Sequence, residues 1–257
     1  MISAARRRSM NHIINFIREN QPYFENFITR STYHSNGIEG NTLSYAETYA
    51  IIFNDNSFKV NAKPRELYEA INHKYALDYL LKNIEEPLSQ EMIKQLGIII
   101  NKNISEVDGY RTVPVMIRGA EHIPPRPAEV PQAMMYFVYN YDHTQHGSIY
   151  EKMADMHLQY ERIHPFADGN GRTGRLLLNF ELLRQDQAPI VIPKDERSRY
   201  FELLAACDQK GLAAFFEELE QEERKLLMEF GYDVEQRKEQ EERKAPPVRK
   251  EERGPKL

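Results

Sequence analysis

Residues 164–175 read HPFADGNGRTGR, and the apolar run LLLNFELL follows directly at 176–183. Apolar residues at nearly every position of that run predict a helix that is buried on most sides. The glycines at 169 and 171 lie where the chain enters this helix, so backbone N–H groups there point out of its positive end. Such an end binds anions, phosphate above all. The stretch therefore predicts a phosphate-binding loop that opens a buried helix.

Four polar side chains of this stretch suit a site for a nucleotide–metal complex. Arg172 and Arg175 are three positions apart on the first helical turn and can bind phosphate oxygens on one side. Asp168 offers a carboxylate oxygen of the kind that Mg²⁺ binds beside substrate phosphates. His164 titrates near neutrality and can take a proton from a hydroxyl nucleophile.

The glycines allow two other interpretations. Gly169, Gly171 and Gly174 have the spacing of the dinucleotide-binding fingerprint, but that fingerprint follows a strand. Residues 151–163 have helical spacing and few β-branched residues, which excludes it. A Gly-Lys-Ser/Thr ending, as in a P-loop, is missing as well. A plain Gly-Asn-Gly turn between two helices would leave the register of His164 and Asp168 with the arginines unexplained.

The stretch resembles the Fic motif, His-x-Phe-x-Asp/Glu-Gly-Asn-Gly-Arg-x-x-Arg, and every specified position matches. The lead-in at 154–163 and the continuation at 189–201 are also similar to this family, so the resemblance covers about residues 90–225. It implies an all-α protein, a Fic-fold helical bundle with a small β-hairpin flap.

A second segment, SNGIEG at 35–40, is similar to the Ser/Thr-x-x-x-Glu-Gly/Asn inhibitory motif of autoinhibited Fic proteins. Ser35 and Glu39 are four positions apart, hence on one helical face, and Gly40 can end the helix. The resemblance implies the class with an N-terminal inhibitory helix, in which Glu39 occupies Arg175, the arginine that should hold the γ-phosphate. Without a Fic motif in the same chain, this hexapeptide would indicate only a helix C-cap.

A third segment, residues 109–125, predicts a short hairpin. Apolar residues alternate with others over 113–117, and the chain can turn back at 119–120. Pro114 favours an edge position. The resemblance implies the Fic flap, which holds a target segment by strand addition so that its hydroxyl meets His164. The flap residues expected to dock the target are Val115, Met116, Ile117 and Gly119.

The resemblance implies a protein adenylyltransferase, which transfers AMP from Mg-ATP to a Ser, Thr or Tyr hydroxyl of a protein and releases pyrophosphate. His164 is then the general base, and Asp168 binds Mg²⁺. The backbone N–H groups at 169–171 and the Asn170 side chain hold phosphate oxygens. The residues expected to bind the nucleotide are Asp168, Gly169, Asn170, Gly171, Arg172, Thr173, Gly174, Arg175, Tyr200 and Asp208.

Two alternatives to this activity stay open. In the first, the same residues work as a deAMPylating phosphodiesterase, with Glu39 positioning the water. In the second, the chain is a binding module without catalysis, which would have no reason to keep His164.

Composition limits the remaining possibilities. The chain has 257 residues, ample for a core, and its formal net charge of −5 argues against a nucleic-acid partner. A single cysteine, Cys207, rules out an internal disulfide and suits a reducing compartment. No stretch approaches the ~20 apolar residues of a membrane helix. We expect a cytoplasmic protein whose partners are ATP and protein targets, itself included, and for which a homodimer is allowed.

Helical spacing predicts helices over 9–30 with a break near Pro22, 44–53, 65–81, 89–100, 130–141, 149–163, 195 or 198 to 206, and 212–228. From about residue 233 the composition changes to Glu, Lys, Arg and Pro, which cannot bury enough apolar surface to fold. We therefore expect an N-terminal helical region over 1–88 with the inhibitory motif, a Fic core with C-terminal helices over 89–230, and a charged, disordered tail over 231–257.

Overall fold

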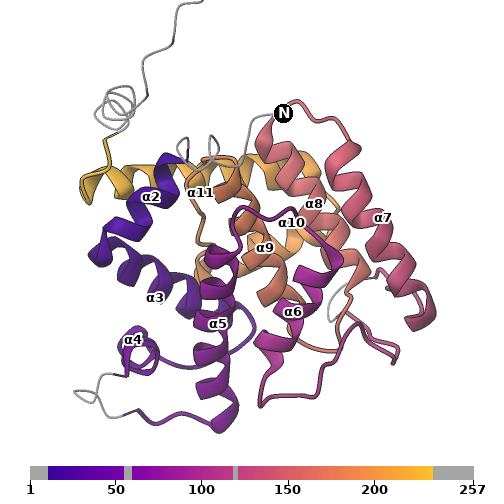
Figure 1. Ribbon diagram of the computed structural model, residues 1–257. Helices are drawn as coiled ribbons and strands as arrows, with labels where there is room; N and C mark the ends of the chain where they lie inside the picture. The colour runs from indigo at the N-terminus through magenta and orange to yellow at the C-terminus, as the bar shows by residue number, and fades with distance from the viewer. Residues whose placement is uncertain (1–10, 55–59, 118–120, 234–257) are drawn as a thin grey trace, which may run out of the picture.

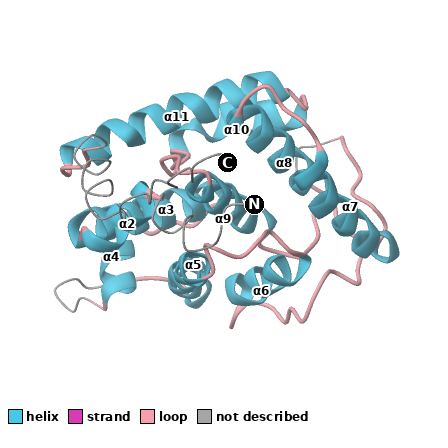
Figure 2. Cartoon of the chain, turned by 45° about the horizontal axis from the view of Figure 1, so that its top comes forward, coloured by secondary structure: helices cyan, strands magenta, loops and turns pink. Residues whose placement is uncertain are grey.

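The computed structural model describes residues 11–54, 60–117 and 121–233, and these residues form helices joined by loops (Figures 1 and 2). Within these ranges no strand is present, which confirms the all-α prediction. The helices in chain order are α2 (His12–Glu19), α3 (Gln21–Ile38), α4 (Tyr45–Phe53), α5 (Pro64–Lys82), α6 (Gln90–Asn101), η1 (Pro127–Glu129), α7 (Val130–His143), α8 (Ile149–Ile163), α9 (Asn170–Arg184), η2 (Lys194–Glu196), α10 (Arg197–Ala205) and α11 (Gln209–Glu229).

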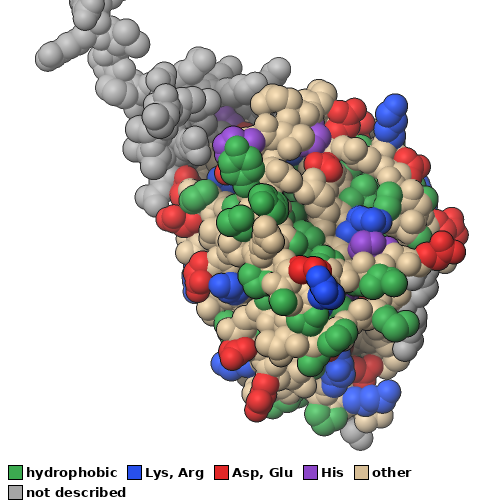
Figure 3. Space-filling model, turned by 90° about the vertical axis from the view of Figure 1, so that its right-hand side faces the viewer, with side chains coloured by type: hydrophobic (Ala, Val, Ile, Leu, Met, Phe, Trp, Pro, Cys, Tyr) green, Lys and Arg blue, Asp and Glu red, His purple; other side chains and the backbone are tan. Residues whose placement is uncertain are grey.

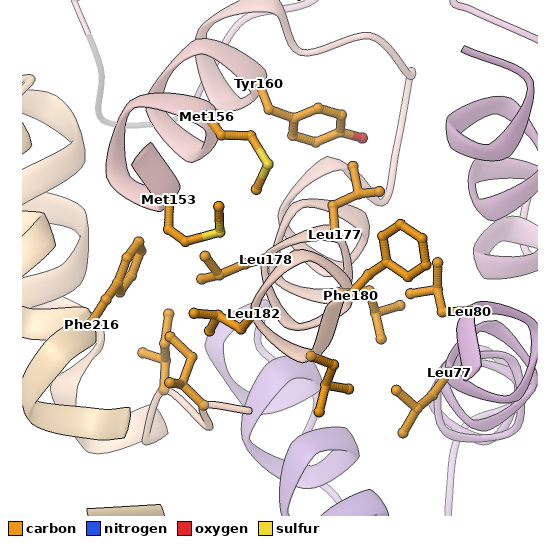
Figure 4. Close-up of a cluster of buried hydrophobic side chains, with 14 of the residues drawn as sticks. Leu77, Leu80, Met153, Met156, Tyr160, Leu177, Leu178, Phe180, Leu182 and Phe216 are labelled. Atoms are coloured by element: carbon orange, nitrogen blue, oxygen red, sulfur yellow. The ribbon is translucent and has the colours of Figure 1, made fainter. Parts of the chain in front are cut away.

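The predicted buried helix is α9, and it lies at the centre of the molecule. Every residue from Leu176 to Leu183 is buried. The helix packs against α3, α5, α6 and α8. Figure 4 shows Phe180 facing Leu80 of α5, whereas Leu178 faces Met153 of α8 on the other side. Because each of its faces meets another helix, α9 holds its N-terminal end in a fixed place.

The helix α3 is part of the same core. Tyr23, Phe27 and Ile28 have no exposed surface. The Tyr23 hydroxyl donates to Glu223 Oε1 of α11 at 2.7 Å, and the Arg30 guanidinium donates to both oxygens of that carboxylate at 2.6 and 2.8 Å. One hydrophobic core therefore includes residues on both sides of position 88. The boundary between the N-terminal region and the Fic core at that position stays a prediction from the sequence.

Most helix bounds follow the predictions from helical spacing, and serine side chains cap α4, α6 and α8. The helices α4 to α8 begin and end within two residues of the expected positions. The expected break near Pro22 is present, because the Asn20 side chain caps α3 by accepting from the backbone N–H of Tyr23 at 3.0 Å. α3 then continues to Ile38, and Gly40 follows with φ +96°. Residues 234–257, most of the predicted tail, lie outside the described residues.

The predicted hairpin is absent from the described residues of 109–125, and the segment runs without paired strands. The Arg111 side chain instead binds backbone carbonyl groups of this segment and of the neighbouring loop. It donates to the carbonyls of Pro125 at 2.6 Å, His164 at 2.8 Å and Val113 at 3.2 Å. Val115, Met116 and Ile117 belong to no strand, and Gly119 lies outside the described residues.

The face on the right of Figure 1 shows hydrophobic side chains interspersed with charged ones (Figure 3). Among the helices that the structure describes, we find none that is both long and apolar enough to cross a membrane.

Candidate active site

His164 lies at the point where α8 ends. It takes the left-handed conformation, with φ +50° and ψ 63°, and its backbone N–H donates to the Tyr160 carbonyl at 3.0 Å. Its own carbonyl accepts from Arg111, and its ring Nδ1 lies 3.3 Å from the carbonyl oxygen of Glu161. Burial lowers the pKa of His164. The ring is therefore neutral near pH 7 and can accept a proton.

The loop between α8 and α9 is held rigid by Asn170. Its side-chain oxygen accepts from the Phe166 N–H and its amide nitrogen donates to the Phe166 carbonyl, both at 2.8 Å. The Phe166 ring packs on α6, where a Cβ at Gly97 would lie 2.3 Å from the ring. Both polar atoms of the Asn170 side chain thus have partners within the loop, and its contact with phosphate stays a prediction. Its backbone N–H, at the first position of α9, still points out of the helix end.

A cavity of about 410 Å³ lies at the N-terminal end of α9. Three parts of the chain form its wall: the end of α3, the first turns of α5 with the residue before them, and the loop from His164 into α9. Its lining residues are Glu39, Gly40, Asn41, Lys63, Arg65, Glu66, Glu69, His164, Ala167, Asp168, Gly169, Asn170, Gly171 and Arg172. The predicted base, metal ligand and anion-binding helix end thus face one space.

The predicted contact between Glu39 and Arg175 is present. Arg175 Nη2 donates to Glu39 Oε1 at 2.7 Å and to the Ser35 carbonyl at 2.9 Å, and Nε donates to Ser35 Oγ at 2.9 Å. A Cβ at Gly171 would lie 2.3 Å from Glu39 Oε1, so the absence of a side chain there admits the carboxylate. The Arg175 side chain is 6% exposed and that of Glu39 is 36% exposed. The anion site of α9 therefore already holds a carboxylate from α3.

Asp168 is paired with Arg172 and with Arg65, and Arg65 was not among the predicted site residues. Its Oδ1 accepts from the Gly169 N–H at 2.6 Å and from Arg172 Nη2 at 3.3 Å, and its Oδ2 accepts from Arg65 of α5. Burial raises the pKa of Asp168, but Arg172 and Arg65 outweigh burial and leave the pKa below its usual value. Glu69 accepts from Arg65 Nε at 2.9 Å. No motif marked Arg65 or Glu69, because both lie on α5, far from the loop in sequence.

Tyr200 and Asp208, expected near the adenine, do not line this cavity. Tyr200 has no exposed surface, and its hydroxyl lies 2.6 Å from His157 Nε2. Asp208 caps α11 by accepting from the Gly211 N–H at 2.9 Å. Packing in the core therefore fixes the position of Tyr200, and the capping hydrogen bond fixes that of Asp208.

Thr173 and Gly174, also expected at the nucleotide, lie on the side of α9 that faces α8. Thr173 has no exposed surface, and a Cβ at Gly174 would lie 2.7 Å from Glu161 Oε1. These two residues let α8 and α9 approach each other and do not line the cavity.

The donor chemistry around Asp168 fits Mg²⁺ that arrives with a nucleotide. Within the described ranges, no three His, Cys, Asp or Glu residues form a cluster that could hold a metal by protein ligands alone. Mg²⁺ commonly takes one or two carboxylates and completes its shell with phosphate oxygens and water. Asp168 is ionised and 34% exposed toward the cavity, which meets that requirement.

Curated relatives are similar in sequence to most of this chain. "Protein adenylyltransferase Fic" of Drosophila melanogaster is 33% identical over 195 residues, which are 71% of this chain and 38% of that protein. The protein of the same name from Drosophila grimshawi is 31% identical over 193 residues, again 71% of this chain and 38% of the relative. The chain therefore spans about 38% of the length of these curated relatives.

Solved structures show the same arrangement of helices. A Fic domain containing signaling protein from Bacteroides thetaiotaomicron superposes with a TM-score of 0.74 at 25% identity, over 86% of this chain and 97% of that one. Fic-1 from C. elegans superposes with a TM-score of 0.67 at 25% identity, over 84% of this chain and 65% of that one. The Fic/DOC family model matches residues 87–182, which include α8, the loop and most of α9. On its motif, its fold and these matches, the chain belongs to the Fic/DOC family.

Proposed function

We propose that this chain is a protein adenylyltransferase that transfers AMP from Mg-ATP to a Ser, Thr or Tyr hydroxyl of a protein and releases pyrophosphate. The observation that carries the proposal is the shared cavity, where a neutral His164 faces the N-terminal end of α9 together with Asp168 and Arg172. Transfer of a nucleotidyl group to a hydroxyl requires a general base and an anion site in the same cavity.

In this proposal the chain mainly positions reactants and stabilises charge. The N–H groups at the start of α9 bind phosphate oxygens, and Arg172, 1% exposed, adds a fixed positive charge. Asp168 would hold Mg²⁺, which supplies further positive charge to the phosphates when bound. His164 accepts the hydroxyl proton as the oxygen attacks the α-phosphorus. The bond from that phosphorus to the bridging oxygen breaks, and pyrophosphate leaves.

We further propose that Glu39 inhibits this reaction in the resting protein. Its carboxylate occupies Arg175, so a γ-phosphate would lose its guanidinium partner and meet a like charge. A displaced triphosphate presents its α-phosphorus off the line of attack, and small misplacements of this kind can cost ~10²-fold in rate.

One observation favours a second candidate function, the hydrolysis of AMP from a modified protein. Glu39 lines the cavity together with His164 and keeps 36% of its side chain exposed. A carboxylate in this place can bind and orient a water, which would make Glu39 a requirement for this hydrolysis.

Two assays on the same variants test both functions. Transfer of ATP labelled at the α-phosphate into lysate proteins, and into the chain itself, is measured for the wild type, Glu39→Gly and Glu39→Gly/His164→Ala. AMP release from the labelled products is then measured with the wild type and Glu39→Gly. We expect transfer by Glu39→Gly alone. Release by the wild type but not by Glu39→Gly would favour hydrolysis, and no transfer by any variant would refute the proposed activity.

As partners we propose ATP and protein targets, the chain itself included, in a cytoplasmic setting that the exposed Cys207, without a disulfide partner, supports. A homodimer and the nucleotide's adenine contacts stay predictions from the resemblance.

A further inference from the structure

Arg65 brings a positive charge into the cavity from outside the matched Fic domain. It lies on the first turn of α5, before the domain match begins at residue 87. Its Nη2 pairs with Asp168 Oδ2, and its Nε donates to Glu69 Oε1 at 2.9 Å. The first contact spans 103 positions of sequence, so it exists only because α5 packs against α9.

The contact with Arg65 takes the one Asp168 oxygen that the loop itself does not use. Oδ1 is bound by the Gly169 N–H and by Arg172, both of which belong to the loop and to α9. Oδ2 has Arg65 as its partner, and both residues line the cavity. A cation that binds Oδ2 must therefore compete with the guanidinium.

Arg65 is able to leave this position. Its side chain is 55% exposed, whereas that of Arg172 is 2% exposed and fixed between Asp168 and Glu69. Glu69, 7% exposed, keeps a bond to Arg65 Nε that does not depend on Asp168. The guanidinium can thus release Oδ2 while its other end stays attached to α5.

We propose that Arg65 is the resident counter-ion of Asp168 and competes with a divalent metal for that carboxylate. The inference rests on the proposed role of Asp168 as the Mg²⁺ ligand. Metal binding then requires the displacement of Arg65, in addition to any movement of Glu39. The cavity would be closed to catalysis by two separate contacts, one on the γ-phosphate arginine and one on the metal ligand.

Binding of Mn²⁺ together with a non-hydrolysable ATP analogue, kept at the same concentration for every variant and followed by the electron paramagnetic resonance signal of the protein-bound ion, tests this competition without any measurement of activity. We expect Arg65→Ala to bind Mn²⁺ about fivefold more tightly than the wild type, which corresponds to about 1 kcal/mol. Lys63→Ala is the matched control, since it removes a positive charge from the same wall. Of the two cations, only Arg65 forms an ion pair with Asp168 among the described residues. Lys63→Ala therefore reports the general electrostatic effect, and its gain should be clearly smaller.

Asp168→Asn separates the failure of this inference from the failure of the metal role. If Asp168→Asn binds Mn²⁺ as tightly as the wild type does, the carboxylate is not a metal ligand. That result refutes both the metal role of Asp168 and the proposed competition. If Asp168→Asn loses binding but Arg65→Ala gains no more than Lys63→Ala, Asp168 is a ligand and Arg65 does not compete. A gain specific to Arg65→Ala supports the proposal.

Discussion

Replacement of Glu39 by glycine should raise AMP transfer, and the size of the rise follows from the contacts of that carboxylate. Glu39 makes one charged hydrogen bond of 2.7 Å to Arg175 in a site where the arginine is 6% exposed. Hydrogen bonds to charged groups contribute about 1.5–3 kcal/mol, and the partial exposure of Glu39 favours the lower end. At 1.4 kcal/mol for each factor of ten, about 1.5–2 kcal/mol corresponds to a rise of about tenfold to thirtyfold.

The assay compares wild type, Glu39→Gly and Glu39→Gln by incorporation of ATP labelled at the α-phosphate. Glu39→Gln should rise less than Glu39→Gly, because the amide keeps its bulk against Gly171, where a Cβ would lie 2.3 Å from Oε1. Glu39→Gly/His164→Ala is the control for transfer by another route. Equal, low incorporation by the wild type, Glu39→Gly and Glu39→Gln would refute inhibition by Glu39. The motif at 35–40 would then be only a helix cap.

Four further outcomes are expected. Adding His164→Ala to Glu39→Gly should lower transfer by about 10²–10⁴-fold while a calorimetric titration shows ATP binding unchanged, and residual activity within a few-fold would contradict the base role. Arg175→Ala should be inactive, and adding Glu39→Gly should not rescue it in the transfer assay; a rescue would show that Arg175 is not the partner shared by the γ-phosphate and Glu39. Because burial lowers the pKa of His164, the transfer rate of Glu39→Gly should rise with pH below 6.5 and be flat above it, and a rise that continues above pH 7 would contradict a neutral base. Gly97→Ala should destabilise the fold by about 1–3 kcal/mol in urea unfolding, because the new Cβ would overlap the Phe166 ring; an unchanged midpoint would show that the ring can move.

The features that the sequence predicts well are those encoded by neighbouring residues. Gly40 ends α3, Ser44 and Ser89 cap α4 and α6, and the apolar run at 176–183 forms the central helix. The pairing of Glu39 with Arg175 was predicted across the chain only through the resemblance, since no spacing rule joins positions so far apart.

The features that were missed depend on packing between distant elements. Arg65 meets Asp168 because α5 and α9 lie together, and nothing within the segment around Arg65 indicates it. The contact of Tyr200 with His157 was also not foreseen; a tyrosine hydroxyl in a core needs a hydrogen-bond partner, and the expected role of Tyr200 near the adenine stays a prediction. The hairpin was expected from alternation, but the described part of the segment has no paired strands, and Arg111 binds the carbonyls of Val113 and Pro125.

The burial of α3 decides what kind of event can switch the chain on. Tyr23, Phe27 and Ile28 are wholly covered, and Arg30 is bound to Glu223 of α11. A helix packed in this way cannot move out of its place as a unit unless the core around it unfolds. A shortened chain lacking α3 would report loss of folding, whatever its effect on inhibition. Any physiological trigger therefore has to work on a small scale, by turning one carboxylate at the C-cap of the helix while the helix itself stays where it is.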